Sequence, residues 1–245
     1  VLERKGSRVG LITTRGFRDA LELRRRTRPH TFGLHGSFEP IIPRDLRLEI
    51  SERLDAEGNV VVPLAEDEVA GLVASLRALA VEGIVVHFIH SYANSAHEQR
   101  CGELVREAWP DIPITLGSDI MPEVREFERG STAAINGYVQ PLISRYLDSL
   151  TGELRGRGFD QELLVMQGNG GMMDAPLAGA HAVHTVMSGP AAGAIATGRT
   201  GVQSGFPNLI ACDMGGTSFD VSLIIDGDPA VTREKELDYS VPVHV

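Results

Sequence analysis

A glycine turn carrying two hydroxyl side chains lies between two short apolar stretches near the end of the 245-residue sequence. Residues 213–220 read Asp-Met-Gly-Gly-Thr-Ser-Phe-Asp. Gly215 and Gly216 have no Cβ, so their backbone N–H groups can approach an anion closely and form a nest for phosphate oxygens. Thr217 and Ser218 add hydroxyl donors to the same turn. The segment therefore predicts a phosphate-binding loop between two strands.

Two carboxylates flank this turn, although carboxylates by themselves repel phosphate. We therefore expect Asp213 and Asp220 to hold Mg²⁺, directly or through water, or to position a nucleophile. A purely structural hairpin is the alternative, but it would not require two acids around a hydroxyl pair between buried strands. Asp213 and Asp220 are thus the predicted catalytic and metal-binding residues.

Two further glycine-containing segments are candidates for the same site. Asn169, Gly170 and Gly171 follow an apolar stretch, and they either line a nucleotide or substrate cleft or form a plain tight turn. Residues 187–196 are rich in alanine and glycine, which allows two domain halves to pack closely at a hinge or simply builds a tightly packed helix. Gly189 from this run joins the three turn residues as a candidate for binding a cofactor.

A polar group of another kind lies in the first half of the chain. His87, His90, His97 and Glu98 occupy the end of an expected strand and the loop beyond it, where α/β proteins usually bind ligands. Their spacing is not a recognised zinc signature. A metal site, a contact to substrate or another subunit, and a hydrogen-bonded loop all stay open. The arginine-rich stretch 24–28 is open in the same way, as a solvated helix end, an anion site or a subunit contact.

Strands and helices alternate along the chain, and this order must position the candidate residues. Short apolar runs predict buried strands, and apolar residues at helical spacing predict amphipathic helices. We expect strands at 9–13, 47–54, 60–62, 84–89, 112–116, 163–166, 209–213 and 221–225, and helices at 17–26, 66–80, 98–108, 131–150 and 191–198. This alternation means βαβ units and a mostly parallel sheet. The glycine-rich stretch 152–158 is the clearest expected boundary.

The composition argues against several classes of protein. A net charge of −10 argues against nucleic-acid binding. The apolar stretches are much shorter than the roughly 20 residues that span a bilayer, and no signal peptide is visible, so no membrane partner is expected. Cys101 and Cys212 cannot build a disulfide framework or a CxxC metal site, which fits a reducing cytoplasm. The sequence begins without Met and stops inside an expected strand, so we expect part of a longer polypeptide.

Several stretches, in order along nearly the whole chain, resemble the hydantoinase/oxoprolinase family, which includes the A subunit of hydantoinases. They are residues 13–19, 90–94 with 97–98, 126–129, 138–141, 166–171, 187–196 and 213–223. The last of them also resembles the second phosphate loop of the sugar kinase, actin and heat-shock chaperone superfamily. The family includes ATP-dependent enzymes that open cyclic amides and ATP-dependent carboxylases of ketones such as acetone and acetophenone.

The resemblance implies an α/β fold with two domains. Residues 1–128 would be the C-terminal part of the hydantoinase/oxoprolinase N-terminal domain, built from βαβ units, and residues 129–245 the beginning of an actin-like ATPase domain. It also implies ATP and Mg²⁺ as cofactors, and a hydantoinase B-type subunit or domain as partner in an oligomer. The first phosphate loop and the adenosine-binding segment are expected outside these residues, and Phe219 stands where the family often has Thr.

The implied activity is ATP-dependent hydrolysis of a cyclic amide such as hydantoin, N-methylhydantoin or 5-oxoproline. ATP would phosphorylate the amide oxygen, and water would then open the ring. An ATP-dependent ketone carboxylase is the alternative, in which the ketone becomes an enol phosphate before carboxylation. A non-catalytic, ATP-gated protein of the actin or chaperone kind is a second alternative, which the phosphate loop alone would permit.

Overall fold

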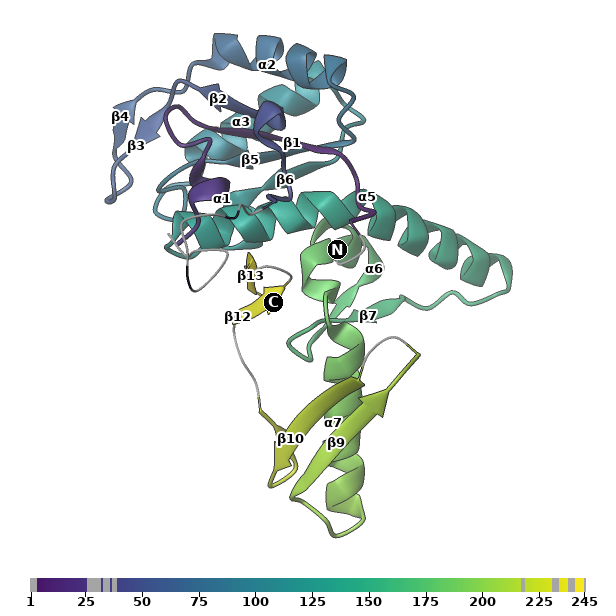
Figure 1. Cartoon of the computed structure of the whole chain (residues 1–245). Helices are drawn as coiled ribbons and strands as arrows, with labels where there is room; N and C mark the ends of the chain where they lie inside the picture. The colour runs from purple at the N-terminus through teal and green to yellow at the C-terminus, as the bar shows by residue number, and fades with distance from the viewer. Residues whose placement is uncertain are drawn as a thin grey trace. The chain divides into compact units, whose positions relative to one another are not determined.

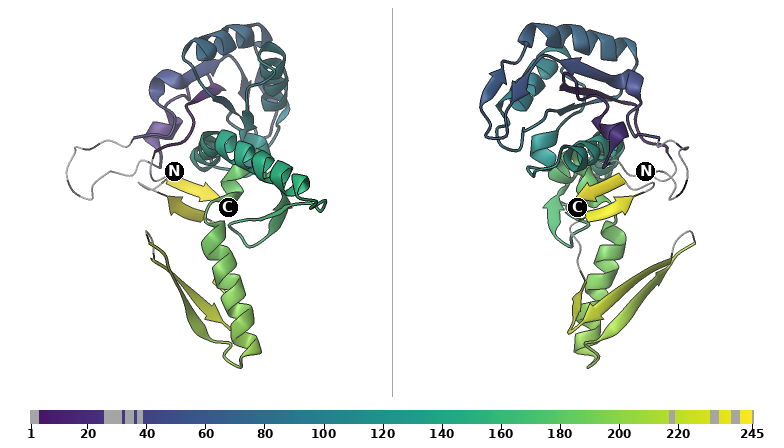
Figure 2. Two further views of the ribbon diagram at one scale, coloured as in Figure 1. Left: turned by 90° about the vertical axis from the view of Figure 1, so that its right-hand side faces the viewer. Right: turned by 60° about the vertical axis from the view of Figure 1, so that its left-hand side comes forward.

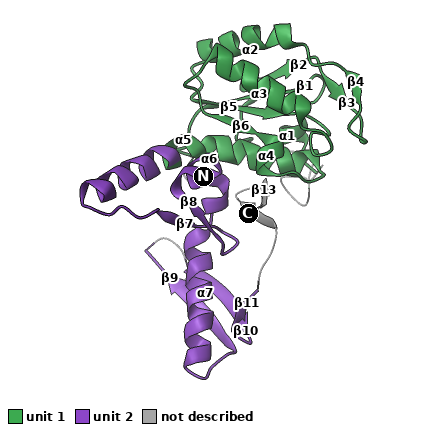
Figure 3. Ribbon diagram, turned by 180° about the vertical axis from the view of Figure 1, so that it is seen from behind, with its two compact units in different colours: residues 1–143, 236–244 green, residues 144–235, 245 purple. Residues whose placement is uncertain are grey.

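The computed structural model describes residues 4–25, 32, 36, 39–216, 219–230, 234–237 and 241–244. The chain forms two compact units, shown in different colours in Figure 3. Unit 1 comprises residues 1–143 and 236–244, and unit 2 comprises residues 144–235 and 245. Helix α5 (Glu126–Gly156) belongs to both units, because the division falls within it.

Unit 1 is built on a four-stranded parallel sheet, as the alternation of strands and helices predicts. The strands are β1 (Val9–Thr14), β2 (Arg47–Ile50), β5 (Gly83–His87) and β6 (Ile114–Leu116). Their order is β2-β1-β5-β6, and every neighbouring pair is parallel. All residues of β1 and β5 are buried, as expected for a parallel sheet that is covered on both faces.

Helices cover both faces of this sheet. Figure 1 shows α2 (Glu66–Ala78) and α3 (Ala96–Ala108) on one side and the first part of α5 on the other. The inward side of α2 is apolar, and Leu76 is fully buried there. Burying one such side chain contributes roughly 1.5–3 kcal/mol. On the other side, a Cβ on Gly137 of α5 would lie 2.7 Å from Val85 Cγ2, so glycine allows this helix to approach the sheet.

Short elements complete unit 1. They are α1 (Ala20–Leu23), the 3-10 helix η1 (Arg44–Leu46), the hairpin of β3 (Arg53–Leu54) and β4 (Val60–Val62), and α4 (Gly117–Ile120). Within the described residues, no helix combines the length and the apolar character that a bilayer span requires.

The described part of unit 2 contains the last part of α5, two antiparallel hairpins and three further helical segments. The first hairpin is β7 (Leu164–Met166) with β8 (Met172–Asp174), followed by α6 (Ala175–Ala180), the 3-10 helix η2 (Ala182–Thr185) and α7 (Ser188–Gln203). The second is β9 (Leu209–Met214) with β10 (Phe219–Ile225), and β11 (Asp228–Pro229) extends it. Strand β12 (Glu234–Leu237) crosses the division between the units and pairs with β13 (Val241–His244), which belongs to unit 1.

Three expected elements differ from those observed, each for a local reason. The helix expected at 17–26 is reduced to α1, because Arg24 has a φ of 52° that a right-handed helix cannot continue through. The strand expected at 47–54 divides into β2 and β3 around Glu52, whose buried carboxylate accepts a hydrogen bond from the Thr14 hydroxyl.

The third difference concerns the glycine-rich stretch 152–158, which is not a break after the helix expected at 131–150. Helix α5 continues through Gly152 to Gly156, and Pro141 lies inside it. A Cβ would meet no other atom within 4 Å at Gly152 or Gly156, so these glycines lie on open helix surface. Glycine there costs only about 1 kcal/mol relative to alanine. Gly158, with a φ of 85°, follows the helix end.

Candidate functional site

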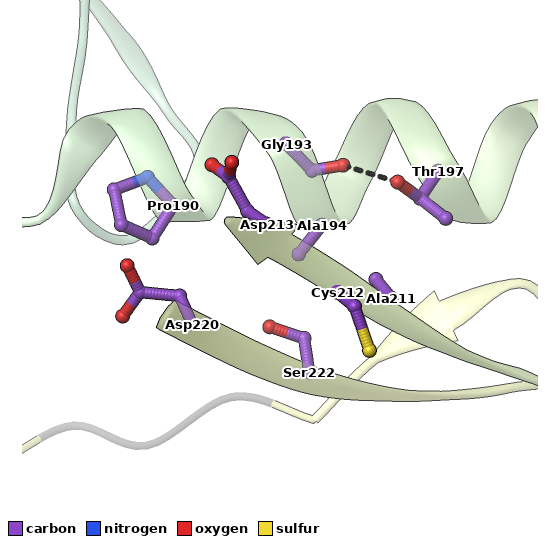
Figure 4. A pocket seen from close by; sticks show the side chains of 9 residues that line it. All are labelled: Pro190, Gly193, Ala194, Thr197, Ala211, Cys212, Asp213, Asp220 and Ser222. Carbon is purple, nitrogen blue, oxygen red and sulfur yellow. Dashed lines mark hydrogen bonds between the residues drawn. The ribbon is translucent and has the colours of Figure 1, made fainter. Parts of the chain in front are cut away.

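The two predicted catalytic aspartates face each other across one hairpin. Asp213 of β9 and Asp220 of β10 are direct partners in the antiparallel register. Directly opposite residues project to the same face of the sheet, with Cβ atoms about 4.5–5.5 Å apart. Ala211 and Ser222, two residues further from the turn on each strand, form another direct pair and share this face. Figure 4 shows the two carboxylates near helix α7.

Helix α7 lies along this hairpin within unit 2, as both views in Figure 2 show. Its small residues allow the close approach, since a Cβ on Gly198 would collide with the backbone oxygen of Gly227. A Cβ on Gly201 would likewise meet the Phe206 carbonyl oxygen at 2.7 Å. These two glycines lie beyond residues 187–196. Within that run a Cβ on Gly189 or Gly193 would meet nothing within 4 Å, so both interpretations of the run, a hinge and a packed helix, stay open.

A pocket of about 190 Å³ lies between α7 and the strands. Pro190, Gly193 and Thr197 contribute from the helix, at the i, i+3, i+7 spacing of one helix face. Asp213 and Asp220 contribute from the strands. Pockets for whole small-molecule ligands usually measure about 300–1,000 Å³, so this space suits a phosphate-sized group rather than a complete nucleotide.

The paired carboxylates fit a magnesium ion. Like charges directly opposite each other on a hairpin destabilise it, and a cation between them removes the repulsion. Mg²⁺ is usually held by one or two carboxylates together with the phosphates of a bound nucleotide. Among the described residues, no group of three His, Cys, Asp or Glu side chains could hold a metal without such help. A role of Asp213 and Asp220 in holding Mg²⁺ therefore stays a prediction.

The structure describes only part of the predicted phosphate loop. Gly215 and Gly216 follow β9 and are exposed. A Cβ on Gly216 would meet nothing within 4 Å, so space is open beside it. Thr217 and Ser218 lie outside the described residues. The phosphate-binding role of these four residues therefore stays a prediction.

The turn after β7 packs against α7 but does not line the pocket. The Asn169 side chain accepts a hydrogen bond from Gly171 N at 2.8 Å, which closes the turn. Gly170 has a φ of 88°, and a Cβ there would lie 2.5 Å from Ile195 Cδ1. These contacts are what a tight turn packed on a helix requires. Gly189 is exposed in the first turn of α7, next to the pocket-lining Pro190.

The alternation of strand residues points to Ser222, a pocket residue that the sequence analysis did not single out. Ser222 lies two residues after Asp220 and therefore on the same face of β10. On the helix, Thr197 also lines the pocket, and its hydroxyl donates to the Gly193 carbonyl at 2.7 Å. Both residues could have been found by extending the strand and helix periods from the predicted aspartates and glycines.

In the polar group of unit 1, Glu98 and His97 are hydrogen-bonded, whereas His87 Nε2 and His90 Nδ1 are buried without a hydrogen-bond partner among the described residues. Buried Glu98 accepts hydrogen bonds from Phe88 N at 2.7 Å, the Ser91 hydroxyl at 2.6 Å and Ser118 N at 2.7 Å. His97 Nδ1 lies 2.9 Å from a carboxylate oxygen of Glu52. These contacts support the hydrogen-bonded loop among the three interpretations that the sequence leaves open.

His87 makes the stability of unit 1 depend on pH. Burial, together with the nearby Arg129 guanidinium, lowers the pKa of His87 from 6.5 to about 3. The unfolded chain therefore takes up a proton below pH 6.5 that the folded chain does not, so the stabilisation present above pH 6.5 is lost as the pH falls toward 3. We expect this residue alone to lower the unfolding free energy by about 2 kcal/mol between pH 7 and pH 5.

Urea denaturation at pH 7 and pH 5 tests this expectation, with His87→Gln as the comparison. The variant has no titrating group at this position, so its loss of stability between the two pH values should be smaller than that of the unmodified chain by the same amount. An equal loss in both proteins would show that His87 does not titrate as the structure implies.

Comparison with known proteins gives matches over nearly the whole chain. The hydantoinase/oxoprolinase family matches residues 129–245, and the N-terminal region of that family matches residues 1–109. An uncharacterized protein of Methanocaldococcus jannaschii is 37% identical over 94% of this chain and 34% of its own length. Caprolactamase subunit alpha of Pseudomonas jessenii is 31% identical over 99% of this chain and 36% of its own length.

A solved structure shares the fold. Acetone carboxylase in its nucleotide-free form superposes with a TM-score of 0.85 at 29% identity, covering 100% of this chain and 36% of that one. This match confirms the predicted α/β fold class. The chain spans about a third of the length of each of these three proteins.

Proposed function

Because the chain belongs to the hydantoinase/oxoprolinase family, we propose that it is part of an ATP-dependent enzyme that hydrolyses a cyclic amide. Hydantoin, N-methylhydantoin, 5-oxoproline and caprolactam are the substrates that we would examine. Similarity to caprolactamase subunit alpha supports a cyclic amide, since caprolactam belongs to that chemical class. The division into an N-terminal domain at 1–128 and an ATPase domain from 129 is part of the same proposal.

The observation that carries the proposal is the direct pairing of Asp213 with Asp220 at the pocket beside α7. Two carboxylates on one face of a hairpin can bind a cation, and the glycines that follow β9 offer backbone donors to an anion. A magnesium–phosphate group satisfies both requirements at once. We therefore assign Asp213 and Asp220 to Mg²⁺ and to catalysis.

The residues of this chain would bind and orient the reacting groups. The backbone N–H groups of Gly215 and Gly216, with the hydroxyls of Thr217 and Ser218, would hold phosphate oxygens. Further candidates for contacting the nucleotide are Asn169, Gly170 and Gly171, in the turn after β7, and Gly189, in the first turn of α7.

Mg-ATP, when bound, would supply the phosphoryl group that converts the amide oxygen into a leaving group. The overall reaction turns ATP, the cyclic amide and two molecules of water into ADP, phosphate and the ring-opened acid. Because the amide oxygen leaves with the phosphate, water supplies both oxygens of the new carboxylate and the protons of the released N–H group. The pocket residues would stabilise the charge that develops on the transferred group.

A ketone carboxylase is the second candidate, and the structural match to acetone carboxylase favours it. The same phosphate site would serve, because activation of a ketone oxygen also needs phosphoryl transfer. Relatives that are named as subunits, such as caprolactamase subunit alpha and the acetone carboxylase beta subunit, support a partner. We propose a hydantoinase B-type subunit or domain in an oligomer.

Phosphate release from Mg-ATP by the full-length protein with its partner subunit tests the proposal. We expect hydantoin, 5-oxoproline or caprolactam to raise the rate by more than about tenfold, since a bound acceptor completes the reacting geometry. Acetone and acetophenone are compared with and without bicarbonate. If a ketone raises the rate of phosphate release only when bicarbonate is present, the carboxylase is the correct proposal and the hydrolase is wrong. If none of these compounds changes the rate of phosphate release, both proposals are contradicted.

A further inference from the structure

A second, larger pocket lies in unit 1 at the carboxyl end of the parallel sheet. It has a volume of about 610 Å³, within the range of roughly 300–1,000 Å³ that is usual for small-molecule sites. Phe17 follows the end of β1, and Ile89 and His90 follow the end of β5. Ligands of open α/β sheets usually bind outside the carboxyl ends of the strands. The position is therefore that of a binding site.

Much of the pocket wall is apolar. Phe17, Leu23, Ile89 and Phe127 line it, and Ile89 is 3% exposed. Two aromatic rings and two aliphatic side chains offer a surface on which the body of an apolar or aromatic ligand can be buried. This wall favours an organic molecule over an inorganic ion.

The acidic groups of the pocket already have basic or backbone partners. Asp19 pairs with Arg44 at 2.8 Å, and the Arg44 hydrogen bond lowers the pKa of Asp19. Glu126 accepts a hydrogen bond from His90 N at 3.3 Å and lies 3.7 Å from the Arg129 guanidinium. Their negative charges are thus largely balanced within unit 1.

One cation of the pocket is held without a carboxylate. The Arg53 guanidinium lies 4.7 Å from the centroid of the Phe17 ring, a stacked arrangement that orients it. Among the residues that the structure describes, no ion pair involves Arg53. The pocket therefore presents a positive charge beside an apolar wall.

We propose that this pocket binds a small organic carboxylate with an apolar body, and that Arg53 anchors the carboxylate. The planar guanidinium presents paired N–H donors that match the two oxygens of a carboxylate. The apolar residues would bury the rest of the ligand. All the residues that line this pocket belong to unit 1.

Calorimetric titration of the full-length protein tests the proposal, with benzoate as the probe and benzamide as its neutral isostere. We expect benzoate to bind at least about tenfold more tightly than benzamide, because only benzoate offers an anion to the guanidinium. Arg53→Met should weaken benzoate binding by about tenfold or more and leave benzamide binding within about twofold. Arg53→Lys keeps the positive charge without the planar guanidinium. Its affinity for benzoate should therefore lie between that of the unmodified protein and that of Arg53→Met.

Arg77 provides a matched control. Its guanidinium lies 4.5 Å from the centroid of the Trp109 ring, so it is stacked like Arg53 but does not line the pocket. Arg77→Met should leave benzoate binding unchanged. Equal affinities for benzoate and benzamide, unaltered benzoate binding in Arg53→Met, or no binding of benzoate at about 10 mM would each overturn the proposal. Thermal unfolding of each variant verifies that it is folded.

Discussion

Asp213→Asn is expected to lower amide-stimulated release of phosphate from Mg-ATP by roughly 100- to 1,000-fold, the usual effect of removing one preorganised group that stabilises transition-state charge. The substitution keeps the size of the side chain and removes its negative charge. Asp213 lies directly opposite Asp220, so the variant leaves a single carboxylate to hold Mg²⁺. Steady-state assays of the full-length protein with its partner subunit provide the measurement.

Asp226→Asn is the control for this substitution, because Asp226 lies on the same hairpin but away from the pocket. It is exposed in the turn after β10, with a φ of 53° that asparagine adopts readily. We expect nearly full activity. Without Mg²⁺, Asp213→Asn should be as stable as the unmodified protein or more stable by about 0.2–1 kcal/mol, since the like-charge pair is gone. Retention of more than about a tenth of the activity by Asp213→Asn would contradict the assigned role.

Glu98→Ala is expected to destabilise unit 1 by about 3–5 kcal/mol, as breaking buried charged interactions does. The variant leaves the backbone N–H groups of Phe88 and Ser118 without this acceptor, whereas the Ser91 hydroxyl can still donate to the Phe88 carbonyl at 3.0 Å. Burial raises the pKa of Glu98, and its hydrogen bonds from Phe88, Ser91 and Ser118 oppose that effect by favouring the ionised form.

Urea denaturation followed by the fluorescence of Trp109, the single tryptophan of the chain, measures this loss. Glu103→Ala is the comparison, because Glu103 lies on the same helix, is exposed and pairs with Arg100. We expect a change below about 1 kcal/mol for that variant. Equal effects of the two substitutions would show that the network around Glu98 contributes little to stability.

The sequence predicts the regular elements well where hydrophobic pattern and local signals agree. The helix expected at 66–80 is observed as α2, and the strands expected at 209–213 and 221–225 are observed as β9 and β10. The prediction that these two strands are buried is wrong for this structure, because most of their residues are exposed. Predicted and observed elements differ where tertiary contacts or the backbone conformation of a single residue determine the end of an element. The positive φ of Arg24 shortens α1, and no local pattern indicates it. Gly152 remains helical because a long helix tolerates an exposed glycine at small cost.

The candidate site shows the same limits. Spacing alone predicts two aspartates around a glycine turn, but only the register reveals that Asp213 and Asp220 are direct partners. The sequence also groups His97 with Glu98, although their side chains have different partners. His97 bonds to Glu52 and Glu98 to the backbone around Phe88. Such partners come from distant segments and are set by the packing of α3 against the sheet, which residue spacing does not encode.

The binding of ATP with and without Mg²⁺ tests the central claim most directly. It is measured on the full-length protein and on the Asp213→Asn/Asp220→Asn double variant. We predict that Mg²⁺ strengthens ATP binding to the unmodified protein by at least about tenfold, and that the double variant loses this increment, because the two paired carboxylates hold the ion. An equal Mg²⁺ increment in both proteins would show that the metal binds elsewhere, and the assignment of this hairpin to Mg-ATP would be wrong.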